Sequence, residues 1–174
     1  RDERGSPVQG VSVTLRQRGV LGTVSERLST GQDGLATRAG APGPGIDVAG
    51  EVEIIVRAPS RPVYPAQTVR VNRTIDGSVT HAVTLETTPP TAELTAMGPI
   101  GPRQVVLLQA WDSAVPAGAV EYRWDFDGDG DVDEVTTRPL ARYELAEGGT
   151  TPSVTVLDRA GKTDTATLPL NVSG

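Results

Sequence analysis

Tyr122-Arg123-Trp124-Asp125-Phe126-Asp127-Gly128-Asp129-Gly130-Asp131-Val132-Asp133 is the stretch of sequence that decides the fold. Its first part belongs to a predicted strand over residues 120–126, and its second part alternates Asp with Gly. Asp and Gly favour tight turns, because Gly readily adopts positive φ and Asp hydrogen-bonds to its own backbone. The stretch therefore predicts a strand that runs into a hairpin turn. Trp124 is expected to anchor a small core, with Tyr143 packed beside it.

Period-two alternation of apolar and polar residues continues on both sides of this stretch, and helical periodicity is scarce. In the second half of the chain, further strands are predicted at residues 91–96, 105–111, 153–157 and 165–172. In the first half, the alternating stretches are residues 10–16, 51–57, 69–72 and 82–85. Because each strand offers one apolar face, we expect sheets that stack face to face. The sequence therefore predicts an all-β fold.

The chain is divided at Thr87-Thr88-Pro89-Pro90. Proline cannot donate to a β-ladder, and paired prolines favour a stiff, extended connection. Aromatic residues make up only 3% of the 174 residues, which suits two small aliphatic cores better than one large core. We therefore predict two domains, at residues 1–88 and 89–174.

Composition excludes several classes of function. The chain has no cysteine, so disulfides, thiolate metal sites and a cysteine nucleophile are excluded. Its net charge is −6 and its basic residues are scattered, which argues against a nucleic-acid partner. The apolar runs are too short to span a membrane. With His81 as the only histidine, a serine triad or a zinc site is not expected, and we predict that the chain is not an enzyme.

Residues 90–173 resemble a PKD domain, the polycystic-kidney-disease type of Ig-like sandwich. The matching segments are the stretch quoted above, Pro90-Thr91-Ala92, and Val154-Thr155-Val156-Leu157-Asp158-Arg159-Ala160-Gly161. Residues 1–88 resemble the carboxypeptidase regulatory-like and bacterial Ig-like families, on residues 2–15 and 29–37. In that pattern Gly5-Ser6-Pro7 turns the chain into a strand, and Asp33-Gly34 forms a turn that needs positive φ. Together the resemblances imply two tandem Ig-like or transthyretin-like β-sandwiches.

The acidic stretch from Asp125 to Glu134 holds six carboxylates in ten residues and has two interpretations. In the first, Asp and Gly form only the hairpin turn of the family, with the carboxylates in water. In the second, Asp127, Asp129, Asp131 and Asp133 bind a calcium ion, which prefers six to eight oxygen ligands and would relieve the repulsion among the charges. A full EF-hand is excluded, because position twelve of the loop is Thr136 and no helix flanks it. Calcium is the one cofactor that the sequence suggests.

The resemblances imply a non-catalytic interaction, adhesion or spacer module of a larger, exported bacterial protein, located outside the cell or on its surface. The expected partner is a protein or a polysaccharide at the cell surface, and the fragment is expected to be monomeric and not to span a membrane. Two alternatives stay open. One is an accessory region that places a secreted protease or glycosidase near its substrate, and the other is a structural component of an envelope machine.

Overall fold

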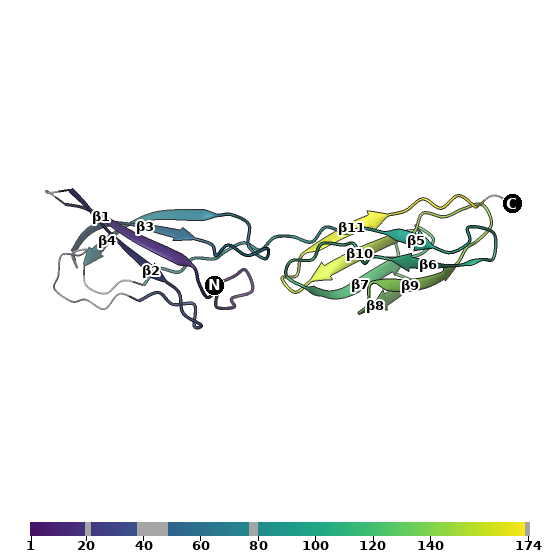
Figure 1. Cartoon of the computed structure of the whole chain (residues 1–174), viewed down its shortest axis with the longest axis horizontal. Coiled ribbons are helices and arrows are strands. Elements are labelled where there is room, and N and C mark those ends of the chain that lie inside the picture. Colours follow the sequence, from purple (N-terminus) through teal and green to yellow (C-terminus); the bar gives the residue numbers. More distant parts are fainter. Residues whose placement is uncertain (20–21, 38–48, 77–79, 173–174) are drawn as a thin grey trace. The chain divides into compact units, whose positions relative to one another are not determined.

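The computed structural model describes residues 1–19, 22–37, 49–76 and 80–172, and all the regular secondary structure in them is β-strand (Figure 1). The predicted all-β class is confirmed. Contacts divide the chain into two compact units, Arg1–Thr87 and Thr88–Gly174. None of the residues described belongs to a helix that is long and apolar enough to cross a membrane.

The first unit contains one four-stranded antiparallel sheet in the order β2-β1-β3-β4. Its strands are β1 (Ser12–Gly19), β2 (Gly22–Ser29), β3 (Ala49–Arg57) and β4 (Thr68–Asp76). The register pairs Val13 with Val56, and Val56 with Val69. Because residues paired across an antiparallel ladder share a face, these valines form an apolar face.

Extended segments from both ends of the first unit cover that apolar face. The buried core joins Val56 of the sheet to Val8, Val11 and Leu85. Leu85 forms a parallel bridge with Asp2, and its backbone N–H donates to the Arg1 carbonyl at 2.9 Å. The predicted strand over residues 82–85 thus contributes a single bridge and an extended segment, and the described segments that cover this face of the sheet are irregular chain.

The turn predicted at Asp33-Gly34 packs against the turn predicted at Gly5-Ser6-Pro7. Gly34 has φ of +73°, and a Cβ at this position would lie 3.0 Å from the Cβ of Pro7. The Asp33 carboxylate accepts the Leu35 N–H at 2.9 Å, which closes the turn. Glycine is therefore required at position 34 both for its backbone angle and for its lack of a side chain.

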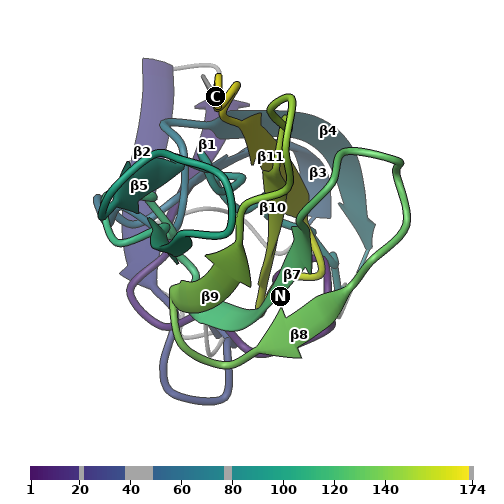
Figure 2. The same ribbon diagram turned by 90° about the vertical axis from the view of Figure 1, so that its right-hand side faces the viewer.

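The second unit is a sandwich of two antiparallel sheets (Figure 2). One sheet has the order β11-β10-β7-β8 and the other β5-β6-β9. The first sheet consists of β7 (Ala119–Asp125), β8 (Glu134–Thr136), β10 (Ser153–Asp158) and β11 (Thr163–Thr167). The second consists of β5 (Thr95–Met97), β6 (Val105–Gln109) and β9 (Leu140–Glu144).

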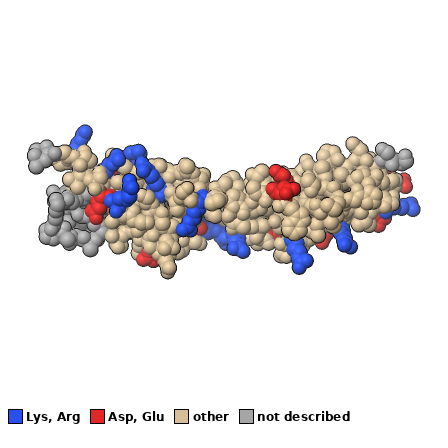
Figure 3. Space-filling model, viewed as in Figure 1, with Lys and Arg blue, Asp and Glu red and all other residues tan. Residues whose placement is uncertain are grey.

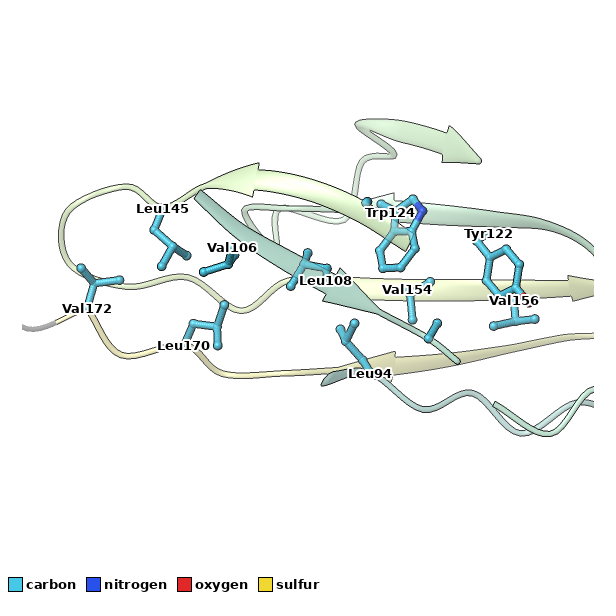
Figure 4. Packing of buried hydrophobic residues seen from close by; sticks show 12 residues of the cluster. Leu94, Val106, Leu108, Tyr122, Trp124, Leu145, Val154, Val156, Leu170 and Val172 are labelled. Carbon is cyan, nitrogen blue, oxygen red and sulfur yellow. The ribbon is translucent and has the colours of Figure 1, made fainter. Parts of the chain in front are cut away.

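Side chains from the two sheets meet in one closed core (Figure 4). Val106 and Leu108 of β6 and Val154 and Val156 of β10 are all fully buried. Trp124 of β7 is also 0% exposed, which confirms its predicted place in the core. Alternation along β6, β7 and β10 sends every second side chain inward, so the predicted period-two pattern produces this core.

Two pairs of aromatic rings stack in the second unit. Tyr122 stacks beside Trp124, with ring centroids 6.5 Å apart. Tyr143, which we expected next to Trp124, packs against the core cluster that contains Trp124 and stacks on Phe126, with centroids 4.9 Å apart and an angle of 11° between the rings. Tyr122, Trp124 and Phe126 are spaced two residues apart and point to the same face. Tyr143 on β9 pairs with Val106 and meets the end of this row beside the acidic loop.

Candidate functional site

The acidic residues lie in the loop 126–133, which connects the antiparallel strands β7 and β8. Gly128 and Gly130 have φ of +80° and +96°, a conformation that L side chains rarely adopt. A Cβ on Gly128 would come within 2.8 Å of the Thr151 carbonyl oxygen. The Asp and Gly alternation thus lets the loop curl tightly against the segment that precedes β10.

Carboxylates of the loop accept hydrogen bonds from the loop's own backbone. The Asp125 carboxylate accepts the Gly128 N–H at 2.6 Å on Oδ1 and the Gly130 N–H at 3.0 Å on Oδ2. Asp133 Oδ2 accepts the Phe126 N–H at 2.6 Å, and the Asp133 N–H donates to the Trp124 carbonyl at 2.8 Å. Asp side chains commonly close tight turns by accepting hydrogen bonds from nearby backbone N–H groups. The loop is therefore held in a single shape by its own acids.

Three carboxylates converge in this shape: Asp125, which is buried, and Asp127 and Asp133, which are exposed. One oxygen from each lies within 4.8 Å of the other two. Of the residues predicted to bind calcium, Asp127 and Asp133 are thus brought together. Asp129 and Asp131 are exposed and fall outside the group, and Asp129 Oδ1 accepts the Asp131 N–H at 2.8 Å.

Asp125 belongs to the group although it was not among the residues predicted to bind calcium. It is the last residue of β7, and its pairing partner on β10 is Ser153. Asp133 comes close because the hairpin closes between Trp124 and Glu134, which are paired in the β7–β8 ladder. The spacing of the acidic residues alone does not predict that Asp125 and Asp133 meet. A hairpin predicted to begin at Asp125 would have indicated this contact.

The donor set is compatible with a calcium ion. Calcium is bound by oxygens at about 2.3–2.6 Å, so two ligands of one ion lie at most about 5.2 Å apart. The three carboxylates meet this limit. Because Asp127 and Asp133 face solvent, water can supply the remaining oxygens. Within the ranges that the structure describes, no other group of His, Cys, Asp and Glu of this kind is found.

Charge is distributed very unequally between the two units. Residues 88–174 contain 13 acidic and six basic side chains, a net charge of −7, whereas residues 1–87 contain nine acidic and ten basic side chains, a net charge of +1. The negative field acts on Tyr143 next to the loop. Burial raises the pKa of its phenol above 10.0, the charges of Asp127 and Asp133 raise it further, and a hydrogen bond with Thr150 lowers it.

The remaining polar and aromatic candidates lie apart from the loop. Burial raises the pKa of Tyr122, which is itself part of the core. Burial and the Asp2 charge raise the pKa of Tyr64, although the Arg61 charge lowers it. Trp111 is 62% exposed and follows β6. None of these residues adds a ligand atom to the group around Asp125.

Comparison with known proteins finds similarity to solved structures. No protein-family model matches the chain, and no curated protein matches it. Among solved structures, the crystal structure of the PKD1 domain from Vibrio cholerae metalloprotease PrtV is similar, at 25% sequence identity and a TM-score of 0.40. The match covers 50% of this chain and 100% of that domain. The assignment of the all-β class rests on the strands of this chain itself.

Proposed function

We propose that the chain is a non-catalytic interaction and spacer module of a larger protein that acts outside the cell or on its surface. The proposal rests mainly on one observation: the residues that carry the resemblance to PKD domains have structural roles in the second unit. Trp124 fills the core, Asp125 binds two backbone N–H groups of the loop, and Asp158 Oδ1 accepts the Lys162 N–H at 2.8 Å. Residues with such roles stabilise the fold, and the same fold can carry different binding surfaces.

The division into two units supports a role in spacing. Each unit has a core of its own, around Val56 in the first and around Trp124 in the second. Units with separate cores can fold independently and can be joined in series. In the sequence, the boundary between the units at Thr87 and Thr88 is followed by two prolines.

Calcium binding by Asp125, Asp127 and Asp133 is part of the proposal. The ion would balance three converging carboxylates and would stiffen the loop that joins β7 to β8. This set keeps Asp127 and Asp133 from the sequence-based prediction and replaces Asp129 and Asp131 by Asp125. Extracellular calcium modules bind the ion at about 10⁻⁴–10⁻³ M, a range in which a partly exposed site with water ligands is effective.

The location of the parent protein tests the proposed function. Intact cells of the source organism are treated with a protease that does not cross membranes, and the chain is followed with an antibody raised against residues 1–174. We expect the chain to be cleaved in intact cells or to be present in the medium, while a cytoplasmic marker is protected. Protection of the chain together with that marker would overturn the proposal.

A second candidate function is an accessory region that holds a secreted hydrolase near a polysaccharide. Trp111 favours it, because an exposed indole offers a flat apolar surface for a sugar ring, and this side chain is 62% exposed. Affinity electrophoresis in gels that contain neutral polysaccharides tests this function. Retardation of the chain that Trp111→Ala abolishes would support it, and equal migration in gels with and without polysaccharide would refute it.

A further inference from the structure

One face of the sheet in the first unit is polar and rich in arginine. Period-two alternation and the register of the four strands place the side chains of Arg16, Arg18, Arg27, Arg57 and Arg70 on it. Glu51 and Glu53 lie on the same face. All five arginines are exposed. Among the side chains that the structure describes on this face, the arginines outnumber the carboxylates, so a chain with a net charge of −6 carries a positive sheet face.

Glu53 sits between two of these arginines. Its carboxylate lies 3.0 Å from Arg70 Nη1 and 3.8 Å from Arg16 Nη1. A single carboxylate balances only one of the two charges, and it holds both guanidinium groups at the middle of the face. In Figure 3, blue side chains gather over the part of the first unit where β1 and β3 lie.

Hydroxyl and amide groups surround the arginines. The register places Ser25 and Asn72 in the same cross-strand row as Arg16 and Glu53, and Thr14 in the row of Arg27. Neighbouring strands are about 4.8 Å apart, so each row presents a polar group about every 4.8 Å. A linear polymer that lies across the strands can contact several groups of one row. At the β2 edge, a hollow is lined by Thr14, Arg16, Ser25, Glu26 and Arg27.

The side chains on this face indicate which kind of negatively charged partner it fits. Ile55 is the one apolar residue among the side chains that the structure describes on this face, and it is 1% exposed, so these side chains offer no apolar anchor of the kind that dominates protein interfaces. The described part of this face has no aromatic side chain on which a nucleic-acid base could stack. Arginine guanidinium groups match carboxylate and phosphate groups, and sulfate is a similar tetrahedral oxyanion, while hydroxyl and amide groups can bond to sugar hydroxyls.

We propose that this arginine face binds an acidic polysaccharide, a chain of sugars with carboxylate or sulfate groups. The proposal deepens the proposed function and rests on it, because such polymers are met outside the cell. It gives the first unit a partner of its own, separate from the acidic loop of the second unit.

Binding of the full chain to heparin tests the proposal, with titration calorimetry at low and moderate salt. The test variant combines Arg16→Gln, Arg27→Gln and Arg70→Gln. The control variant removes the same charge elsewhere, with Arg73→Gln, Arg138→Gln and Arg142→Gln. Arg73 lies on β4 three residues after Arg70, so its side chain belongs to the opposite face. Thermal unfolding confirms that both variants remain folded.

We expect heparin and polygalacturonate to bind the native chain and the control variant alike, dextran not to bind, and the test variant to bind at least about tenfold more weakly. Equal weakening in both variants would overturn the proposal, since it would show attraction without a defined face. Tighter binding of single-stranded DNA than of heparin would overturn it in favour of a nucleic-acid surface. Self-association of the native chain that the test variant abolishes would overturn it in favour of a second copy. All these results are independent of the cell-surface test, so the two proposals can fail separately.

Discussion

The indole Nε1 of Trp124 donates a hydrogen bond to Thr136 Oγ1 at 2.9 Å, which links the core of the second unit to β8. Thr136 Oγ1 in turn donates to the Arg138 carbonyl at 2.6 Å. The one polar group of the fully buried Trp124 side chain is thereby hydrogen-bonded. The same bond attaches the short strand β8, which has only three residues, to the core.

Thr136→Val should destabilise the second unit. The variant keeps the shape of the side chain but leaves the Trp124 N–H without a partner, which costs about 1–3 kcal/mol of unfolding free energy. Urea unfolding followed by tryptophan fluorescence measures the effect. Thr136→Ser retains the hydroxyl and is the matched control. If the valine and serine variants unfold at the same urea concentration, the hydrogen bond contributes nothing measurable.

Gly128→Ala and Gly130→Ala should differ in their effect, although both positions have positive φ. At Gly130 nothing lies within 4 Å of a new Cβ, so the cost is that of the backbone angle alone, about 1 kcal/mol. At Gly128 the new Cβ would also meet the Thr151 oxygen at 2.8 Å, and we expect about 2–4 kcal/mol. Chemical unfolding of the two variants measures both costs. Equal costs would contradict the close packing of the loop against Thr151.

Calcium should raise the melting temperature of the second unit. At about 10 mM calcium and a dissociation constant near 10⁻⁴ M, the stabilisation is about 2.7 kcal/mol. For a unit of this size that corresponds to an increase of roughly 10 °C or more over the value in EDTA. Differential scanning calorimetry in the two buffers gives the increase. An unchanged melting temperature would leave the loop as a solvated turn.

Asparagine variants should show which carboxylates bind the ion. We expect Asp127→Asn and Asp133→Asn to remove most of the increase, and Asp129→Asn and Asp131→Asn to retain it, because only the first pair lies in the converging group. Since Asp133 also accepts the Phe126 N–H, each variant is compared with itself in EDTA. A loss caused by Asp129→Asn or Asp131→Asn would favour the set of ligands predicted from sequence spacing.

Tyr143 should titrate at a higher pH in the folded chain than in the unfolded chain. Its folded pKa is raised above 10.0, so its contribution to stability is complete below pH 10.0 and is lost as the pH rises through the folded pKa. Absorbance of tyrosinate during an alkaline titration measures the pKa, and Tyr143→Phe assigns the signal. Asp127→Asn should lower this pKa, because it removes one of the negative charges that raise it. An unchanged titration would place the carboxylate too far away to act.

Alternating strands could be predicted from the sequence, whereas irregular ones could not. The predicted segments 10–16, 51–57, 120–126 and 153–157 correspond to β1, β3, β7 and β10, since an alternating pattern specifies which side chains face inward. Strand β2 was missed because Glu26 interrupts the apolar row between Val24 and Leu28. Strand β8 has three residues and presents too little pattern to detect.

The acidic site was predicted only in part, for a geometric reason. Four alternate carboxylates, Asp127 to Asp133, would share one side of an extended strand. The positive φ of Gly128 and Gly130 curls the chain instead, so Asp129 and Asp131 separate from the others. Closure of the hairpin then brings Asp133 back to Asp125. Contacts between the two ends of a loop depend on the ladder beyond it, which local spacing does not reveal.

The pairing of Asp2 with Leu85 has a mechanical consequence. The two segments run parallel, and they are joined by hydrogen bonds from the Arg1 nitrogen to the Val83 oxygen at 3.0 Å and from the Leu85 N–H to the Arg1 oxygen at 2.9 Å. A tensile force that draws residue 1 away from residue 87 makes parallel neighbours slide past each other. It therefore loads these bonds in shear, all at once, whereas an antiparallel pair pulled from its open end peels apart one bond at a time. Under such a force, the two terminal segments of the first unit separate only when both hydrogen bonds break together.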